Sequence, residues 1–268
     1  MGKSKEKKAR EWEILVRSLE KMGLDADDPD DLKVRNLLTD IGADDEHVKA
    51  IAHMMTPIRK NKLVNKYLWK MQGGHDYRLQ IMQTYQIDSP RDENFDKNIG
   101  NHYLLWHGTT KNNVYAILKD GFRWAFASEN AMYENGIYFS NCVTKAAGYI
   151  SESPFKFAGG ADDGSVRPNV RTGYLFLSEV ALGKMYEYMD GEHDAKLLLN
   201  GADSSYGKGS NRPSSWRSVQ ESGSAFKVPV APLKFVQKLR LHYDEYVVYR
   251  ATQIRHKFLV KVAVLPKY

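Results

Sequence analysis

Apolar residues follow helical spacing in the N-terminal part of the chain. They recur three and four residues apart, which is typical of helices with one buried face. The pattern occurs in four stretches, at residues 12–19, 32–41, 45–55 and 63–71. Glycine or proline, which ends helices, follows each stretch, at Gly23, Gly42, Pro57 and Gly73. We therefore expect residues 1–72 to form a small helical segment.

Strand-like patterns replace the helical spacing from Asp76 onward. Aromatic and branched residues, which favour strands, dominate several stretches. These are residues 77–87, 103–106, 135–140, 173–182, 243–249 and 258–265. Two helices are predicted between them, over residues 111–119 with Gly121 as C-cap and over residues 144–149. Polar or glycine-rich loops are expected at residues 88–100, 153–172 and 190–228. Residues 73–268 are thus predicted to form a mixed α+β domain.

Composition narrows the class of protein only slightly. Hydrophobic residues make up 42% and charged residues 27%, as in ordinary globular domains. The net charge of +6 permits an anionic partner but does not identify one. Cys142 is the only cysteine, which excludes an intramolecular disulfide and a four-cysteine zinc site. The charged N-terminus and the lack of a long apolar run predict a nuclear or cytosolic chain that is not secreted and not in a membrane.

A candidate ligand-binding corner follows the strand at residues 103–106. His107 lies where this strand ends, and Gly108 would let a ligand or another backbone come close. A polar turn and the helix at residues 111–119 come next. A histidine at the end of a strand is often purely structural, so this corner alone does not assign a function.

A second candidate lies near the C-terminus, where Glu245 interrupts an apolar strand. A carboxylate among Tyr243, Tyr246 and Val247 costs free energy unless it is paired or used in chemistry. Side chains alternate along a strand, so neighbouring Asp244 is expected on the opposite face and in solvent.

Four sequence blocks, taken in order, resemble one known family. They are Tyr103–Thr109, Asn135–Tyr149, Leu177–Glu187 and Leu241–Tyr249. Together they resemble the catalytic domain of the diphtheria-toxin-like ADP-ribosyltransferases, and in particular the poly(ADP-ribose) polymerases. The family's His-Tyr-Glu triad falls on His107, Tyr138 and Glu245. The likeness runs from about residue 75 to the C-terminus.

The resemblance implies a fold and a reaction. The fold would be the ADP-ribosyltransferase fold of two packed, mainly antiparallel sheets, behind the small helical segment. The reaction would break the nicotinamide–ribose bond of NAD, the substrate, and transfer ADP-ribose to an acceptor, without a metal. The retained Glu245 implies poly(ADP-ribose) formation. Transfer of a single ADP-ribose unit, or a non-catalytic module that binds NAD or ADP-ribose, are the alternatives.

The resemblance also implies residue roles. Catalysis would rest on Glu245, His107 and Tyr138. Binding of NAD would involve His107, Gly108, Thr109, Asn113, Arg123, Tyr138, Ala146 and Tyr149. The acceptor side would include Met132, Lys145 and Tyr243.

Three departures from the family pattern stand out. Ala146 replaces a serine whose hydroxyl bonds the nicotinamide carboxamide, so one hydrogen bond is expected to be missing. The loop between Arg123 and Tyr138 is shorter than usual. The 72 N-terminal residues are fewer than the autoinhibitory helical domain of many chain-forming relatives requires.

Two partners follow from the resemblance, and a third stays open. NAD is one, and acceptor proteins, with the chain itself among the candidates, are the other. The basic start of the chain, Lys3–Arg10, fits either a solvated tail or a patch that binds nucleic acid, so a role for DNA is left undecided.

Overall fold

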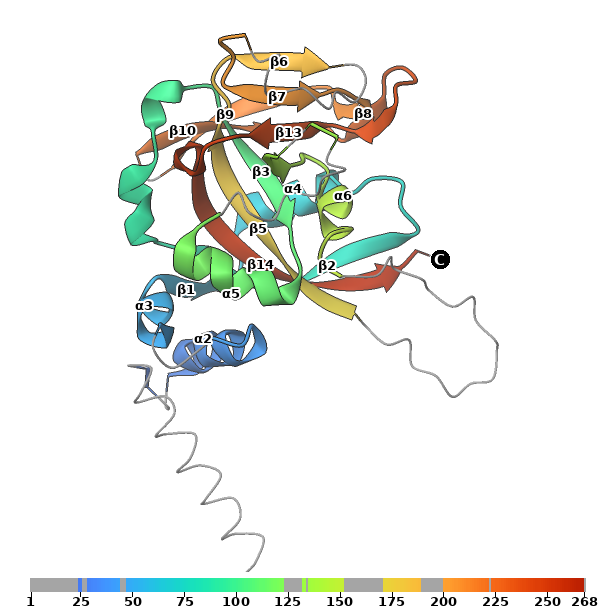
Figure 1. The fold of residues 1–268 in the computed structure, drawn as a ribbon. Helices are drawn as coiled ribbons and strands as arrows, with labels where there is room; N and C mark the ends of the chain where they lie inside the picture. The colour runs from blue at the N-terminus through green and yellow to red at the C-terminus, as the bar shows by residue number, and fades with distance from the viewer. Residues whose placement is uncertain are drawn as a thin grey trace, which may run out of the picture.

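Three β-sheets form the frame of the protein. The computed structural model describes residues 24–25, 28–43, 47–122, 132–133, 135–151, 171–188, 200–221 and 223–267. In this part of the chain a seven-stranded sheet has the order β1-β2-β14-β5-β3-β10-β9. A four-stranded sheet, β4-β13-β7-β6, and a three-stranded sheet, β11-β8-β12, accompany it. Figure 1 shows the smaller sheets near the top of the molecule and α2, α3 and α5 near its lower end.

The elements have the following bounds. The helices are α2 (Pro29–Asp40), α3 (Val48–His53), α4 (Lys62–Lys70), α5 (Lys111–Asp120) and α6 (Val143–Ala147), with 3₁₀ turns η1 (Pro90–Asn94), η2 (Lys97–Ile99) and η5 (Ala251–Gln253). The first strands are β1 (Met55–Ile58), β2 (Tyr77–Ile87), β3 (His102–Gly108), β4 (Ile137–Phe139), β5 (Arg171–Ala181), β6 (Met185–Tyr188) and β7 (Ser204–Gly207). The remaining strands are β8 (Gly209–Pro213), β9 (Trp216–Glu221), β10 (Ser224–Pro229), β11 (Leu233–Phe235), β12 (Leu241–Tyr243), β13 (Glu245–Val248) and β14 (Ile254–Pro266).

The predicted α+β class with mainly antiparallel sheets is confirmed. Among the described strands, the pairs β10–β3, β12–β8 and β6–β7 are parallel and the other pairs are antiparallel. Two packed sheets were expected. In place of the second one, the structure has the four-stranded and three-stranded sheets. These two sheets meet where β12 ends at Tyr243 and β13 begins at Glu245.

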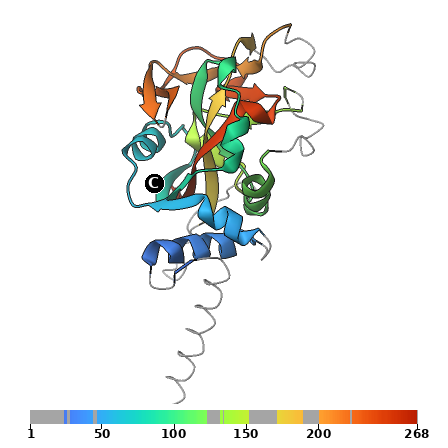
Figure 2. The same cartoon turned by 90° about the vertical axis from the view of Figure 1, so that its left-hand side faces the viewer.

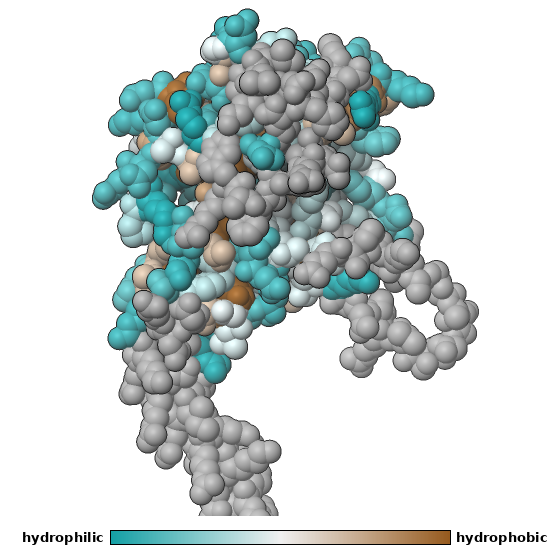
Figure 3. Space-filling model, in the orientation of Figure 1, coloured by the Kyte–Doolittle hydropathy of each residue, from teal (hydrophilic) through white to brown (hydrophobic). Residues whose placement is uncertain are grey.

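Both faces of the seven-stranded sheet are buried, which explains the nearly continuous apolar runs of its central strands. Leu177 of β5 and Val260 of β14 face one core cluster, which includes Trp106 and residues of α4 and α6. Phe176 and Leu259, their neighbours along the chain, face the opposite cluster, which includes residues of α2, α3 and α5. Figure 2 shows helices on both sides of this sheet. On the described part of the face drawn in Figure 3, hydrophilic residues predominate and apolar ones are scattered.

The sequence prediction missed strands in two regions. Residues 190–228 were expected to be irregular, but β7, β8, β9 and β10 lie there. Strand β7 buries Ser204 and Ser205 through hydrogen bonds to Leu182 and Tyr249, so it carries no apolar signature. The predicted helix at residues 45–55 gives way to strand β1 from Met55. Pro57 is tolerated in β1 because this strand lies at the sheet edge. The helix predicted at residues 12–19 lies outside the described residues.

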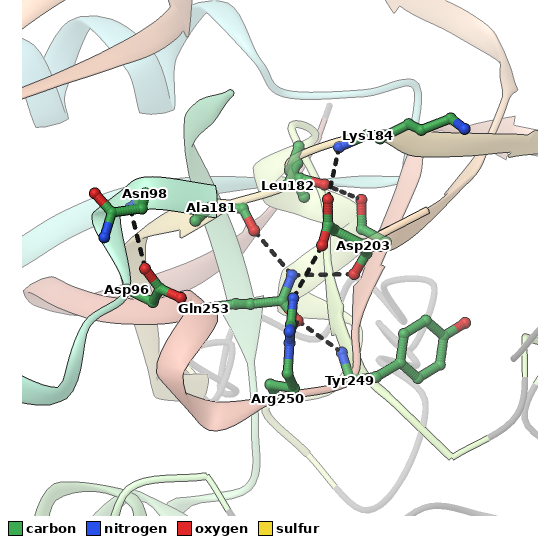
Figure 4. Close-up of polar contacts among 10 residues, drawn as sticks. Asp96, Asn98, Ala181, Leu182, Lys184, Asp203, Tyr249, Arg250 and Gln253 are labelled. Carbon is green, nitrogen blue, oxygen red and sulfur yellow. Dashed lines mark hydrogen bonds and ion pairs between the residues drawn. The ribbon is translucent and has the colours of Figure 1, made fainter. Parts of the chain in front are cut away.

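A buried glutamine holds the junction between β13 and β14. Gln253 is fully buried, and its amide nitrogen donates to the carbonyl oxygens of Ala181, at 2.9 Å, and Asp203, at 3.1 Å. Its amide oxygen accepts the N–H of Tyr249 at 3.4 Å. Arg250 bonds the Asp203 carboxylate at 3.0 Å beside it (Figure 4). These bonds fasten the end of β13, and hence the strand that carries Glu245, to β5 and to the segment before β7.

An aspartate at the end of α2 joins the N-terminal segment to the large sheet. Asp40 forms ion pairs with Lys111 at 2.6 Å and Lys261 at 3.0 Å, and it accepts the Tyr174 hydroxyl. Burial alone would raise the pKa of Asp40, but the hydrogen bonds from Lys111, Tyr174 and Lys261 outweigh it and lower the pKa to about 2. Lys111 begins α5, three residues after Gly108, so α2 is linked to the candidate ligand-binding corner.

We predict that Asp40→Asn destabilises the fold by about 1–2 kcal/mol near neutral pH. The folded pKa of about 2 lies below the usual 3.8, so the carboxylate stabilises the fold above about pH 4. This contribution is lost as the pH falls toward 2. The measurement is urea denaturation from about pH 7 to pH 3, with Asp76→Asn, at an exposed position, as the control. A difference from wild type that does not shrink at low pH would rule out the charge as its origin.

Candidate active site

A pair of backbone hydrogen bonds joins the large sheet to the four-stranded sheet. The N–H of Trp106 donates to the Ser140 carbonyl, and the N–H of Ser140 donates to the Trp106 carbonyl, both at 2.9 Å. The bridge brings the end of β3 beside β4. As a result His107 lies next to Tyr138, and Nδ1 of His107 is 2.8 Å from the Tyr138 carbonyl oxygen.

His107 is held in one neutral form. Because a carbonyl can only accept, Nδ1 of His107 must carry the hydrogen, which leaves Nε2 as an acceptor. Burial lowers the pKa of His107 to about 4, although the bond to Tyr138 acts in the opposite direction. The rings of Phe122 and Phe139 pack around it, with centroids at 4.6 and 5.6 Å. At neutral pH this histidine can therefore accept a hydrogen bond from a hydroxyl group.

Gly108 is required by the close packing of α6 on β3. A Cβ atom at this position would lie 1.7 Å from the carbonyl oxygen of Ala146, so another residue cannot fit without moving the helix. Ala146 itself is 4% exposed and belongs to the core cluster around Trp106. The close backbone approach expected at Gly108 is thus made by the carbonyl of α6.

Two further residues follow this corner, and a third cannot be placed. Thr109 is buried, and its hydroxyl accepts a hydrogen bond from the amide of Asn113 on α5, at 3.2 Å. This bond joins the start of α5 to the residue that follows Gly108. Arg123 lies outside the described residues.

Glu245 is buried and paired with a lysine. It is 7% exposed, and its Oε1 lies 2.8 Å from the Lys145 ammonium. Lys145, on α6, also donates to the carbonyl oxygens of Tyr243, at 3.3 Å, and Asp244, at 3.4 Å. It thus ties α6 to the turn between β12 and β13. The ion pair offsets part of the cost of burying the Glu245 carboxylate.

Glu245 and Tyr138 project from the same face of the four-stranded sheet. Val247 of β13 lies directly opposite Tyr138 of β4, and Glu245 is two residues before Val247. Side chains two residues apart share a face of a strand, so Glu245 and Tyr138 are diagonal neighbours. Burial raises the pKa of the Tyr138 and Tyr149 hydroxyls, and the charge of Glu245 raises both further. The structure therefore groups Glu245, Tyr138 and Tyr149 in one place, with His107 bonded to the backbone of Tyr138.

Of the residues expected on the acceptor side, Lys145 contacts Glu245, and Tyr243 and Met132 contact other groups. The hydroxyl of Tyr243 accepts the Gly74 N–H at 2.6 Å, and its ring stacks on His75 with centroids 5.2 Å apart. Met132 and Tyr138 are both partly buried, and both pack against the buried cluster that contains Val247. Tyr149, expected on the NAD side, is 59% exposed. His75 was not singled out from the sequence, where only the preceding glycine pair marked its position.

Asp244 does not lie in solvent as the sequence predicted. It is 1% exposed, and its carboxylate accepts hydrogen bonds from the Asn141 amide at 2.7 Å and the Gly209 N–H at 2.9 Å. The alternation rule did not apply because Tyr243 and Glu245 belong to different strands. Asp244 is the single residue between β12 and β13, and it turns inward.

The described residues show no candidate metal centre and no candidate membrane span. No group of three or more His, Cys, Asp or Glu residues among them is arranged to hold a metal ion. No described helix has both the length and the apolar character needed to cross a membrane.

Comparison with known proteins agrees with the resemblance seen in the motifs. The family described as the poly(ADP-ribose) polymerase catalytic domain matches residues 60–264. Poly [ADP-ribose] polymerase 2 of Homo sapiens is 31% identical over 236 residues, which cover 81% of this chain and 37% of that protein. Poly [ADP-ribose] polymerase 2 of Zea mays is 31% identical over 264 residues, or 94% of this chain and 36% of the relative.

A rice relative shows the same coverage. Poly [ADP-ribose] polymerase 2-A of Oryza sativa subsp. japonica is 29% identical over 268 residues, covering 94% of this chain and 36% of its own length. The chain thus spans a little over a third of the length of these curated relatives. The family match begins at residue 60, within the segment predicted to precede the catalytic domain.

Proposed function

Since this chain belongs to the family of poly(ADP-ribose) polymerase catalytic domains, we propose that it transfers ADP-ribose from NAD to protein acceptors. The nicotinamide of NAD would leave, and further units would extend the product into a chain. The observation that carries this proposal is the buried Glu245–Lys145 pair, which lies on the same sheet face as Tyr138 and beside the His107 corner. NAD is the substrate, and the chain itself is one of the candidate acceptors.

The chemistry explains why a buried carboxylate is useful here. Breaking the nicotinamide–ribose bond places positive charge on the ribose, as in glycoside hydrolysis. A fixed negative charge nearby stabilises that transition state more than the ground state. Lys145 contacts Oε1 of Glu245, so Oε2 is available to accept a hydrogen bond from a ribose or acceptor hydroxyl. Glu245 would thus both stabilise the ribose cation and activate the acceptor.

The proposal assigns roles toward the rest of an NAD molecule. Tyr138 and the exposed ring of Tyr149 would stack on the flat nicotinamide. The backbone of Gly108 would bond the carboxamide, and Nε2 of His107 would accept from the adenosine ribose. Thr109 and Asn113 would hold the adenosine end together with Arg123, while Lys145, Met132 and Tyr243 would face the acceptor.

Two alternatives use the same site. Transfer of a single ADP-ribose unit would need no acceptor site for a growing chain, and it is disfavoured because Glu245 is present and buried. A non-catalytic NAD-binding module is suggested by Ala146, which offers no hydroxyl to the carboxamide. Incubating the protein with labelled NAD and separating the products by size distinguishes chains, single units and unchanged NAD.

We predict that Glu245→Gln lowers chain elongation by about 100-fold or more, since it removes the charge and keeps the shape. Some NAD hydrolysis or single-unit transfer should survive. Polymer length and nicotinamide release are measured together, and melting temperatures test folding because Lys145 loses its partner. Glu93→Gln, at an exposed position, is the control. Polymers of wild-type length from the Glu245→Gln protein would refute the role given to Glu245.

We predict that Ala146→Ser tightens the binding of benzamide, a nicotinamide-like carboxamide, by about 2–10-fold. A serine hydroxyl would restore one hydrogen bond, worth about 0.5–1.5 kcal/mol. Titration calorimetry on both proteins measures the change. Ala147→Ser, at the next and fully buried position, should not tighten binding and serves as the matched control. Equal affinities in wild type and Ala146→Ser would mean that the Ala146 methyl group faces the core and not the ligand.

We also propose that residues 1–72 support the catalytic domain of this chain and do not gate it. Within this segment, Leu37 and Ile51 share a core cluster with Phe176 and Leu259 of the large sheet. A gate requires a second stable arrangement, and separating these residues would expose that core.

We propose a nuclear or cytosolic location for the protein in the cell.

The expected outcome is that broken duplex DNA changes the initial rate of this 268-residue chain by less than about two-fold. Rates are measured with and without nicked duplex, at several salt concentrations because DNA binding is sensitive to salt. Asp40→Asn is tested alongside, since loosening a gate would raise its rate. A large rise with DNA, or a faster Asp40→Asn protein, would make the N-terminal segment a regulator.

A further inference from the structure

A second buried carboxylate stands next to Glu245. Asp244 is 1% exposed and Glu245 is 7% exposed, and the two are consecutive in the chain. Lys145 pairs with the Glu245 carboxylate but reaches only the backbone carbonyl of Asp244. Burying an acidic side chain is costly unless hydrogen bonds replace its water. The hydrogen bonds of the Asp244 carboxylate therefore indicate its role in the fold.

The Asp244 carboxylate is held by groups from β8, from β13 and from the segment that follows β4. Its Oδ1 accepts the N–H of Gly209, at the start of β8, at 2.9 Å. Its Oδ2 accepts the Asn141 amide at 2.7 Å and the Tyr246 hydroxyl at 3.4 Å. The backbone carbonyl of Asp244 accepts the Ser140 hydroxyl at 2.8 Å. The two residues that follow β4 thus bind both the side chain and the backbone of Asp244.

These contacts set the position of Glu245. Asp244 is the only residue between β12 and β13, so the direction in which it is held decides where β13 begins. A Cβ atom on Gly209 would lie 2.2 Å from the carbonyl carbon of Tyr243, which means that β8 packs directly against the same turn. Tyr138 lies two residues before Ser140, so the turn is also fixed relative to Tyr138.

We propose that Asp244 is a positioning residue, whose buried carboxylate fixes the β12–β13 turn so that Glu245 faces Lys145 and the reacting ribose. This inference rests on the proposed function. Asp244 itself touches neither NAD nor the acceptor. It acts through Glu245, and its effect should appear in the chemical step more than in NAD binding.

An unpaired atom at Asn141 suggests the test. Asn141 turns its NH₂ group toward Asp244, and its Oδ1 is buried with no hydrogen-bond partner. Asp244 offers only acceptors when ionised, so Asn141 cannot turn its oxygen inward. If the acid and the amide exchanged places, Asn at 244 would accept from Gly209 and donate to Asp at 141. The tyrosine hydroxyl can adapt, because it can donate or accept.

The experiment compares Asp244→Asn, Asn141→Asp and the double exchange with wild type. Asn141→Asp places two carboxylates face to face, so kcat should fall by about 100-fold while KM for NAD changes less than about three-fold. Asp244→Asn should lower kcat by about 5–20-fold, because one buried amide group loses its partner. The double exchange should recover kcat to within about five-fold of wild type.

Controls separate this inference from the proposed function and from a general loss of stability. Melting temperatures are measured for every protein, and Asp244→Asn carries the test if Asn141→Asp does not fold. Wild-type kcat in a destabilised Asp244→Asn protein would overturn the positioning role, as would a double exchange that restores the melting temperature without restoring kcat. If wild type releases no nicotinamide from NAD, the proposed function fails and this inference fails with it. An active wild type with unaffected variants refutes only the inference.

Discussion

The two backbone hydrogen bonds between Trp106 and Ser140 are the constraint on which the candidate site depends. They join the seven-stranded sheet to the four-stranded sheet, so they fix the position of one sheet relative to the other. Trp106 is fully buried beneath α6, and His107, the next residue, bonds the backbone of Tyr138. Because β13 pairs with β4, the same bridge also sets the place of Glu245 relative to His107. Residues more than a hundred positions apart in the chain are thus placed relative to one another through one short contact.

Electrostatics around this bridge favour a reaction that develops positive charge. Glu245 and Asp244 are both buried, and Lys145 is the cation that contacts Glu245. Burial raises the pKa of Asp244, while the bonds from Gly209 and Asn141 oppose that rise. The neutral His107 adds no positive charge of its own. A ribose that becomes cationic would therefore meet a carboxylate and acceptor atoms, in a place where water contributes little screening.

Much of the fold could be predicted from the sequence, and two of the failures share one physical cause. Strands β2, β3, β5 and β14 were found because their apolar residues pack on one or both faces of the large sheet. Strand β7 was missed because Ser204 and Ser205 are buried by hydrogen bonds, and Asp244 was misplaced for the same reason. A pattern of hydrophobic residues reveals buried positions only where the buried side chains are themselves apolar. The pattern marked His107 and Glu245 only as candidates, and the family motif then assigned them, with Tyr138, to the expected triad.

The N-terminal segment bears on the site through the same kind of contact. Asp40 ends α2 and pairs with Lys111, the first residue of α5, which follows directly after the corner formed by His107, Gly108 and Thr109. It also pairs with Lys261 of β14, so α2 cannot move without disturbing both a central strand and the helix beside the corner. On the opposite face of the sheet, Tyr67 of α4 donates to the Leu104 carbonyl at 2.8 Å and packs edge-on against Trp106. The segment therefore contacts β3 on one face of the sheet and holds α5 and β14 on the other, and the precision of the His107 corner depends on residues that would take no part in the chemistry.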